Sequence, residues 1–213
     1  QVNEKNMDAL KQGIENLEKH IENIQAFEIC AVVAINKFAS DSEEELEFIK
    51  QRCEEKGIDA VVTDEWGKGG EGAVELAKKV KFTADNCKNE YKPMYDWKWD
   101  VPKKIETIAK NIYGAAAIDF TSTAKADMRK IEKLGLSELP VCVAKTQNSL
   151  SDNPKLLGRP KDFIVTVREI EISSGAGFIV PITGKIMRMP GLPKQPAAEK
   201  IDVDKDGNIS GLF

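Results

Sequence analysis

The chain has 213 residues, of which 41% are hydrophobic and 31% are charged, and this composition excludes a wholly disordered protein. Its formal net charge is −4 with both signs interspersed, which argues against a large nucleic-acid-binding surface. No run approaches the roughly 20 consecutive apolar residues of a membrane-spanning helix, so we expect no membrane partner.

The N-terminal part begins with a helix and a buried strand. Apolar residues recur at steps of three and four over 7–24, which predicts an amphipathic helix packed on a sheet. The run 28–35 (EICAVVAI) is almost entirely apolar, which is typical of a strand buried on both faces. Ser42 and Glu45 form a capping-box pattern that begins the next helix, and Gly57 ends it.

A second strand is expected at 58–62, followed by the glycine-rich segment 67–72 and a helix over 73–80. The alternation of strands and helices then breaks over 81–100, where a polar stretch gives way to tyrosines and tryptophans. Basic and acidic residues are equally frequent there, which argues against single-stranded nucleic acid as a ligand. We interpret this segment as pinned to the core or to a partner subunit.

The strand and helix pattern resumes with a proline-initiated helix over 102–112, which Gly114 ends. A strand over 115–120, a helix over 123–134 and a strand over 139–144 follow. Strands that alternate with helices in this way are the signature of an α/β protein with a parallel, doubly wound sheet.

After about residue 145 the pattern becomes richer in strands. Apolar residues alternate from Phe163 to Val167, and the parity shifts at Ile170, which predicts a β-bulge near Arg168–Glu169.

Short strands are also expected at 178–182 and 185–189, and the remainder is rich in Pro and Gly. We therefore divide the chain into an α/β domain over 1–145 and a small mixed, strand-rich C-terminal subdomain over 146–213.

Ligands of open α/β sheets bind beyond the carboxyl ends of the strands. Phe38 and Trp66 follow two of the predicted strands there, and a pair of facing aromatic rings can clamp a flat heterocycle. Asn36, Lys37 and Asp64 are the polar residues beside them. From the pattern alone, rings in these positions are also typical of loop residues anchored in the core, so both interpretations stay open.

The glycine-rich segment matches GxGxxG, a motif of dinucleotide-binding oxidoreductases. The motif also needs an acidic residue about 20 positions on, at the end of a second strand. Near Glu90 the chain is instead polar and broken by proline. We interpret Gly67, Gly69, Gly70 and Gly72 as a tight turn that frees backbone amides for some other anion.

Two further motifs are incomplete. Gly184-Lys185 resembles the end of a phosphate-binding P-loop, but Ile186 stands where Ser or Thr would bind magnesium, and GxxxxGK[ST] occurs nowhere in the sequence. Three aspartates over 202–206 resemble the start of an EF-hand loop, but Phe213 occupies its twelfth position instead of Glu, so we expect a surface turn.

The cysteines and the single histidine complete the inventory of reactive groups. Cys30, Cys53, Cys87 and Cys142 form no CxxC motif, and we expect reduced thiols, most of them in the core, in a cytoplasmic protein. His20 alone cannot supply a histidine-rich metal site or a Ser-His-Asp triad. We therefore assign no metal ligands and no catalytic residues to this chain.

Several segments resemble the formate–tetrahydrofolate ligase (formyltetrahydrofolate synthetase) family. The segments that carry the resemblance are Ala34-Ile35-Asn36-Lys37-Phe38 with Asp41, Trp66–Gly72 (WGKGGEG), Lys145–Asp152 (KTQNSLSD) and Ile186–Pro193 (IMRMPGLP). The last two are highly specific when they occur together, and the resemblance extends from the first helix to Phe213. It implies a P-loop-NTPase-like sheet, and it implies that this chain is the C-terminal part of the family's enzyme, without the P-loop portion that holds ATP.

The resemblance also implies a function. The family uses ATP and Mg to join formate to tetrahydrofolate through formyl phosphate, giving N10-formyltetrahydrofolate for one-carbon metabolism. In the family a Phe and a Trp sandwich the pterin ring, and their motifs fall on Phe38 and Trp66. Asn36, Lys37 and Asp64 are neighbouring candidates for contacts to the pterin or its tail.

The family is a cytoplasmic homotetramer that responds to monovalent cations, so a homo-oligomer is expected here as well. Without a P-loop, this chain alone is expected to bind folate yet to be inactive. Two alternatives remain: a non-catalytic binding or assembly module and, less favoured, a dinucleotide-binding oxidoreductase domain that uses the GxGxxG turn.

Overall fold

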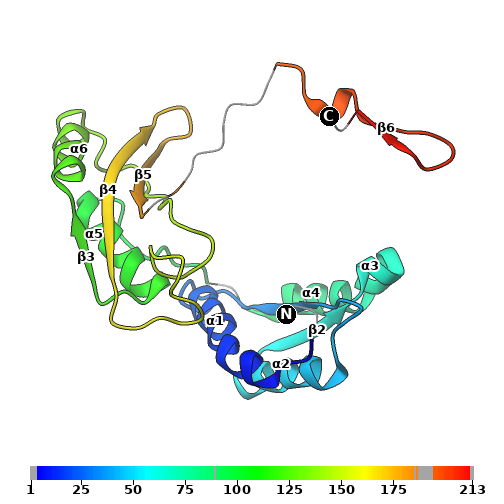
Figure 1. Cartoon of the computed structure of the whole chain (residues 1–213). Coiled ribbons are helices and arrows are strands. Elements are labelled where there is room, and N and C mark those ends of the chain that lie inside the picture. The colour runs from blue at the N-terminus through cyan, green and yellow to red at the C-terminus, as the bar shows by residue number, and fades with distance from the viewer. Residues whose placement is uncertain (1–3, 89, 185, 187–193, 212–213) are drawn as a thin grey trace.

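The computed structural model describes residues 4–88, 90–184, 186 and 194–211. Helices and strands alternate along the chain, which confirms the α/β class (Figure 1). The elements are α1 (Met7–Gln25), β1 (Val32–Asn36), α2 (Glu43–Glu55), β2 (Asp59–Thr63), α3 (Glu65–Lys68), η1 (Gly69–Ala73), α4 (Val74–Asn86), α5 (Val101–Ile108), η2 (Ala109–Tyr113), β3 (Ala117–Phe120), α6 (Ser122–Lys133), β4 (Ile164–Ser173), β5 (Phe178–Thr183), η3 (Ala197–Glu199), β6 (Asp202–Val203) and β7 (Ile209–Ser210).

The helices begin and end where their capping residues predict. At the start of α2, the Ser42 side chain accepts a hydrogen bond from the Glu45 amide, and the Glu45 carboxylate accepts one from the Ser42 amide. Both bonds of the predicted capping box are therefore present. Gly57 and Gly114 follow α2 and η2 with φ angles of 69° and 78°, a left-handed conformation that glycine adopts without strain.

The first sheet consists of β1 and β2, which run parallel with Asn36 opposite Thr63. Helix α4 covers one face of this pair, and α2 with α1 covers the other (Figure 1). Ile21 of α1, Cys53 of α2 and Ile58 form the buried centre of this layer.

A second sheet has the order β3-β4-β5, in which β3 and β4 are parallel and β4 and β5 are antiparallel. The register shifts between Val167 and Glu169, which confirms the predicted bulge. Its core is separate from that of the first sheet and is centred on Val167 of β4, Ile179 of β5 and Ile131 of α6.

The prediction of one continuous doubly wound sheet is therefore wrong, because the described strands form three separate sheets. The physical reason lies in the segment between α4 and α5, after which the chain builds a second hydrophobic core, and each strand pairs beside its own core. The pairing of β3 with β4 also joins residues from both sides of the boundary predicted after residue 145.

The strand predicted at 139–144 is wrong as well. This segment runs beside β5 but forms only two isolated bridges, from Val141 to Ile179 and from Ala144 to Ile182. The carbonyl oxygen of Pro140 accepts a hydrogen bond from the Ile179 amide at 2.9 Å, and the Ala144 amide donates to the Pro181 carbonyl oxygen at 2.8 Å. Pro181 of β5 has no N–H to donate in return, so the two bridges are not joined into a ladder.

The aromatic segment before α5 is pinned to the body of the protein, as the sequence predicted. The ring of Tyr91 stacks on Phe27 with centroids 5.9 Å apart. The hydroxyl oxygen of Tyr95 accepts a hydrogen bond from the Val141 amide at 3.0 Å. The segment thereby connects the layer around β1 with the second sheet.

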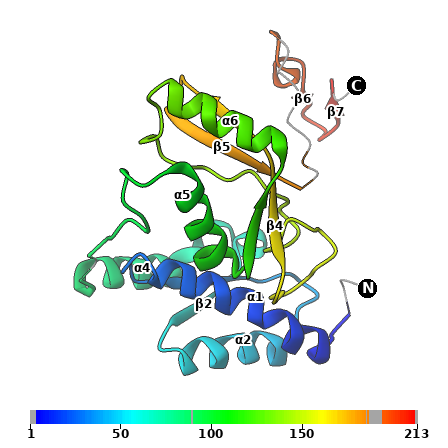
Figure 2. The same ribbon diagram turned by 90° about the vertical axis from the view of Figure 1, so that its left-hand side faces the viewer.

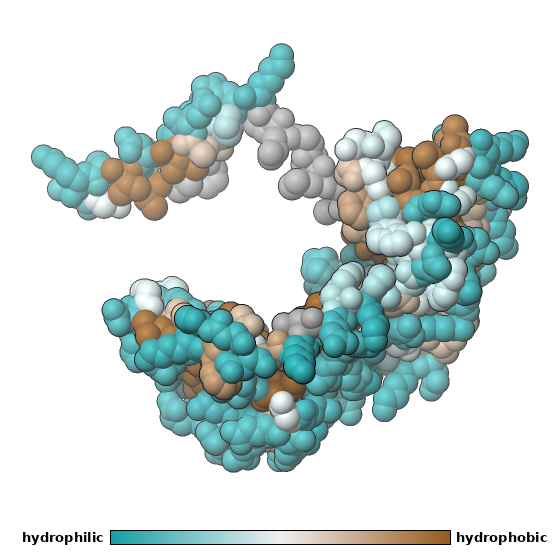
Figure 3. Space-filling view, turned by 180° about the vertical axis from the view of Figure 1, so that it is seen from behind, coloured by the Kyte–Doolittle hydropathy of each residue, from teal (hydrophilic) through white to brown (hydrophobic). Residues whose placement is uncertain are grey.

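The C-terminal part is strand-rich and lies apart from both sheets (Figures 1 and 2). Residues 194–211 are all exposed, and apolar side chains of the β6–β7 hairpin contribute to its surface (Figure 3). The Asp204 carboxylate accepts hydrogen bonds from the amides of Asp206 and Asn208, which confirms the expected surface turn. The strand predicted at 185–189 lies, apart from Ile186, outside the described residues, as does the MPGLP segment.

The cysteines differ from the prediction of reduced core thiols. A disulfide joins Cys30, just before β1, to Cys87, the C-cap residue of α4. Their Cα atoms lie 6.5 Å apart, a separation that a disulfide spans, so the end of α4 and the start of β1 are close enough to be crosslinked. Cys53 is a buried free thiol as expected, whereas Cys142 is exposed.

Within the part of the chain that the structure describes, no helix is both long enough and apolar enough to cross a bilayer.

Candidate functional site

The carboxyl ends of β1 and β2 lie side by side. The two strands are parallel, and the last pair in their register is Asn36 with Thr63. Phe38 follows the end of β1 by two residues and Trp66 follows the end of β2 by three. The two aromatic residues therefore follow adjacent strand ends, at the sheet edge where α/β proteins bind ligands.

Both rings face solvent rather than the core. Phe38 is 58% exposed and Trp66 is 87% exposed, so the interpretation of these residues as core anchors is wrong. The two rings are not in contact with each other; the ring pairs among the described residues are Phe27 with Tyr91 and Tyr95 with Trp97. An exposed large aromatic side chain without a partner is available to a ligand.

A tight turn holds the backbone of Phe38. Its amide donates a hydrogen bond to the Asp41 carboxylate at 2.8 Å, and the Asp41 amide returns one to the Phe38 carbonyl oxygen at 3.1 Å. This reciprocal pair explains why Asp41 stands three residues after the ring, and it fixes the direction in which the chain leaves β1.

A second turn holds Trp66. Asp64 caps the short helix α3, and its carboxylate accepts a hydrogen bond from the Gly67 amide at 3.1 Å. The Asp64 amide in turn donates to the Gly72 carbonyl oxygen at 3.2 Å. A Cβ atom at position 72 would lie 2.1 Å from the Asp64 carbonyl oxygen, so this close approach requires glycine.

The polar candidates beside the rings differ in how far they are free to bind a ligand. Asn36 is exposed at the end of β1. The Lys37 ammonium donates to the Glu43 carboxylate at 2.8 Å, and this hydrogen bond raises the pKa of Lys37 above its usual value. The Asp64 carboxylate is occupied by the turn that presents Trp66, so the structure gives Asp64 a positioning role.

Some backbone amides of the glycine turn over 67–72 already donate hydrogen bonds within the turn. The Gly67 amide donates to Asp64, and the Gly69 amide donates to the Glu65 carbonyl oxygen. Of the four amides predicted to bind an anion, those of Gly67 and Gly69 are therefore already paired, and Gly72 lies inside the 3₁₀ helix η1.

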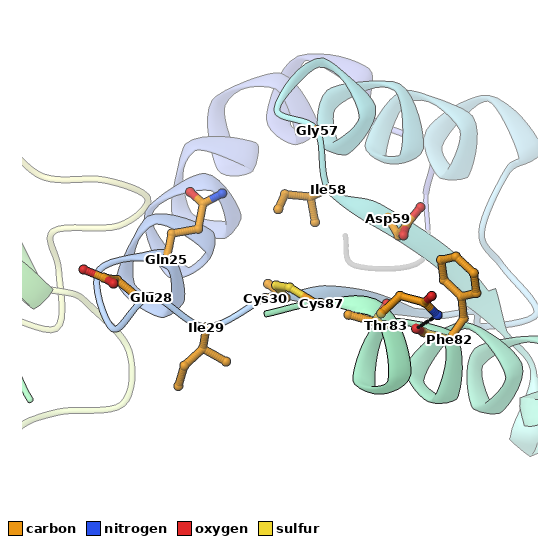
Figure 4. A pocket seen from close by; sticks show the side chains of 12 residues that line it. Gln25, Glu28, Ile29, Cys30, Gly57, Ile58, Asp59, Phe82, Thr83 and Cys87 are labelled. Carbon is orange, nitrogen blue, oxygen red and sulfur yellow. Dashed lines mark hydrogen bonds between the residues drawn. A yellow bond between two sulfur atoms is a disulfide. The ribbon is translucent and has the colours of Figure 1, made fainter. Parts of the chain in front are cut away.

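Sequence reasoning missed two cavities away from this edge. One, of about 480 Å³, lies at the amino ends of β1 and β2, with the Cys30–Cys87 disulfide in its wall (Figure 4). Because the strands are parallel, this cavity is at the opposite end of the pair from Phe38 and Trp66.

The other cavity, of about 500 Å³, lies between α1, η2 and the segment 145–150. The sequence KTQNSL of this segment indicated the family resemblance. No sequence pattern indicated that α1 would form the opposite wall of this cavity.

The described residues contain no cluster of three or more His, Cys, Asp or Glu side chains that could hold a metal ion.

Comparison with known protein families gives one result that spans the whole sequence. A model of the family described as formate–tetrahydrofolate ligase matches residues 1–213. The match includes both strand ends that carry the exposed rings, the glycine turn and the segment that lines the second cavity. The chain therefore belongs to the formate–tetrahydrofolate ligase family, whose substrates are formate and tetrahydrofolate.

Proposed function

We propose that this chain supplies the folate-binding side of the ligase reaction, in which formate and tetrahydrofolate become N10-formyltetrahydrofolate at the expense of ATP. The observation that carries the proposal is the pair of exposed, mutually unpartnered rings of Phe38 and Trp66 at adjacent carboxyl ends of two parallel strands. A pterin is flat and aromatic, so it gains stacking energy on both faces from such a pair, about 0.5–1.5 kcal/mol per ring beyond the burial of surface.

The reaction that we infer has two steps. Formate attacks the γ-phosphate of Mg-ATP, which gives formyl phosphate and ADP, and the N10 amine of tetrahydrofolate then attacks the formyl carbon and releases phosphate. Stacking between Phe38 and Trp66 fixes the pterin plane and hence the direction in which N10 points, which is a contribution through orientation. Asn36 and Lys37 are placed to contact polar edges of the same ligand.

The residues of this chain do not fit the ATP side of the reaction. The sequence contains no GxxxxGK[ST], and the described residues offer no acidic cluster for magnesium. We therefore assign phosphoryl transfer to the family's P-loop portion and derive no step through ATP here. The purified 213-residue chain is expected to show no formate-dependent ATP hydrolysis, and robust turnover would contradict this assignment.

The test of folate binding is a titration of the chain with tetrahydrofolate, followed by isothermal calorimetry. Replacing Trp66 or Phe38 with Ala is expected to weaken binding by roughly tenfold, because each removes one stacking partner together with its contact area. The matched control is Phe82→Ala on α4, because this ring is also exposed, at 61%, but does not lie at the carboxyl ends of the strands.

Two results would refute the proposal. The first is an affinity for tetrahydrofolate that Trp66→Ala and Phe38→Ala leave unchanged. The second is a loss of affinity in Phe82→Ala as large as the loss in the Trp66 and Phe38 variants. Circular dichroism of each variant establishes that the fold is kept.

The dinucleotide alternative finds no support in the geometry of the glycine turn. A dinucleotide-binding turn leads directly into a long helix whose amides meet the pyrophosphate. Here α3 and η1 separate β2 from α4, and the Ala73 position before α4 has no side-chain cap. Fluorescence titration with NADH is expected to show no binding.

A further inference from the structure

The cavity between α1, η2 and the segment 145–150 has an unusual composition. Its volume is about 500 Å³, which suits a small molecule. Its described lining contains Lys145, the chain's single histidine, His20, and several amide and hydroxyl side chains, but no Asp or Glu. In a chain with 35 acidic residues, a carboxylate-free cavity that contains a lysine favours a negatively charged occupant.

Lys145 is held at the cavity wall by backbone atoms. Its ammonium donates hydrogen bonds to the carbonyl oxygen of Thr146 at 2.8 Å and to that of Ser149. The ammonium also lies 5.2 Å from the centre of the Tyr113 ring. Two of its three N–H bonds are thereby used, and burial lowers the pKa of Lys145 below its usual value. A bound anion would offset that cost of burying the charge.

The support behind Lys145 is itself rigid. Ser149 is buried, and its hydroxyl lies 2.9 Å from the hydroxyl of the fully buried Ser151. The Ser151 hydroxyl donates to the carbonyl oxygen of Asn153 at 3.0 Å. The Ser149 carbonyl oxygen, which accepts a hydrogen bond from the Lys145 ammonium, therefore belongs to a loop held by its own hydrogen bonds. The positive charge of Lys145 is thus held in position before a ligand binds.

Tyr113 provides the second observation. Burial raises the pKa of this residue to about 12, yet its hydroxyl has no hydrogen-bond partner among the described residues. The unpaired hydroxyl beside Lys145 is therefore a donor that a ligand could satisfy.

Two asparagine side chains at the wall donate hydrogen bonds to backbone carbonyl groups. The side-chain amide of Asn16 donates to the Gly158 carbonyl oxygen at 2.9 Å, and that of Asn23 donates to the Ile112 carbonyl oxygen at 3.0 Å. These bonds tie α1 to the opposite wall and shape the cavity. Lys145, Tyr113 and the exposed ring of His20 remain as donors for a ligand. The buried side-chain oxygen of Asn23 has no hydrogen-bond partner among the described residues, so it remains as an acceptor for a donor group of the same ligand.

We propose that this cavity binds a small molecule through an oxyanion, a phosphate or a carboxylate group, placed against Lys145 and Tyr113. The volume exceeds that of one such group, so the anion carries an organic substituent or leaves room for water. Phe38 and Trp66 do not line this cavity, so the proposal stands apart from the folate-binding proposal and can fail or succeed without it.

The test is isothermal titration calorimetry of the full chain with two probes, inorganic phosphate and L-glutamate. We expect saturable binding of at least one probe at a single site. Tyr113→Phe is expected to weaken that binding roughly tenfold or more, the cost of losing a hydrogen bond to a charged group. Because the lost hydroxyl has no protein partner, the same variant should unfold at an unchanged or higher temperature.

The control is Tyr91→Phe, since Tyr91 is exposed, stacks on Phe27 and lies outside this cavity. It should bind both probes as the unaltered chain does. Lys145→Met should abolish binding, and Tyr113→Phe keeps the proposal testable if the lysine variant does not fold.

Saturation by phosphate alone supports a phosphate ligand, and saturation by glutamate alone supports a carboxylate ligand. Absence of saturable binding for both probes overturns the proposal. So does binding that Tyr113→Phe leaves unchanged, because that result would place the anion on surface lysines.

Discussion

At the scale of single residues, the glycines of the turn after β2 are not equivalent. Gly72 lies where any side chain would collide with the Asp64 carbonyl group, whereas a Cβ atom at Gly70 would meet nothing within 4 Å. Neither has a φ angle in the left-handed region. Close backbone approach therefore requires glycine at position 72, whereas neither close approach nor a left-handed φ angle requires it at position 70.

Replacing Gly72 with Ala is expected to destabilise the chain by about 1–3 kcal/mol and to displace Trp66, because the backbone must move away from Asp64. Gly70→Ala is expected to change the free energy of unfolding by less than about 1 kcal/mol. Urea unfolding of both variants measures the change in stability. Titration with tetrahydrofolate measures whether Gly72→Ala displaces Trp66. Equal stability of the two variants would show that the close approach at position 72 does not constrain the turn.

Residue identity alone predicted that the two rings follow strand ends, because apolar runs followed by polar residues mark those ends. It left open whether the rings face the core or the solvent. It could not predict that the Asp64 side chain is used by the turn, since that bond depends on the backbone path of α3. The sequence also could not predict the pairing of Cys30 with Cys87, because this pairing depends on how α4 packs against β1.

At the scale of elements, α4 is the least buried long helix around the first sheet. None of its residues is buried, and Val80 and Phe82 are 49% and 61% exposed. Its C-terminal end is fastened by the disulfide between Cys87 and Cys30, which are separated by 57 positions in the sequence. A crosslink across a loop of this length stabilises a fold by about 2–4 kcal/mol, mainly by restricting the unfolded chain.

Reduction of this disulfide is expected to lower the melting temperature by roughly 4–16 °C, given the usual conversion of 2–4 °C per kcal/mol for a chain of this size. Circular dichroism with and without a phosphine reductant measures the change. Cys87→Ser should melt at the lower temperature in both conditions, and Cys142→Ser, at an exposed free thiol, should respond like the unaltered chain. Melting that the reductant leaves unchanged would show that the crosslink contributes nothing to stability.

Most elements followed from periodicity and caps. The capping box of α2 and the bulge of β4 were predicted to within a residue or two, because both are encoded by neighbouring side chains. The segment 139–144 was not, because its apolar residues fit a strand, whereas Pro181 on the facing strand β5 lacks the N–H that would join the two bridges.

At the scale of the whole molecule, two hydrophobic cores meet through a polar interface. One core lies between α1, α2 and β2, and the other between α5, α6 and the β3-β4-β5 sheet. No periodicity in the sequence distinguishes two short sheets from one long sheet, because the difference lies in which strands pair. The sequence therefore predicted the class of the fold but not its division.

The contacts between the cores are polar and come largely from α1. The Lys19 ammonium donates to the Asn111 carbonyl oxygen at 2.7 Å. The Arg159 guanidinium donates two hydrogen bonds to the Glu22 carboxylate, at 2.8 and 2.7 Å. This bidentate pair lowers the pKa of Glu22 below its usual value, chiefly through the hydrogen bond from Arg159.

The sign of the resulting pH effect follows from that shift. A carboxyl group whose pKa is lower in the folded chain stabilises the fold above its unfolded pKa, and this contribution disappears as the pH falls through the folded value. The coupling between the two cores should therefore weaken below about pH 4.3, the ordinary pKa of glutamate. Interfaces of this polar kind allow the parts of a chain to unfold separately once such contacts are lost.

We expect the unaltered chain to show a broader or divided unfolding transition only in acid, and Glu22→Gln to show the same transition already at pH 7. Differential scanning calorimetry at pH 7 and near pH 3.5 compares the two proteins. Glu15→Gln is the matched control, since Glu15 lies on the same helix and is exposed, with no ion pair among the described residues. If Glu22→Gln and Glu15→Gln unfold with the same profile at pH 7, the pair with Arg159 does not couple the cores, and the hydrogen bonds of Lys19 and Asn23 to η2 must join them instead.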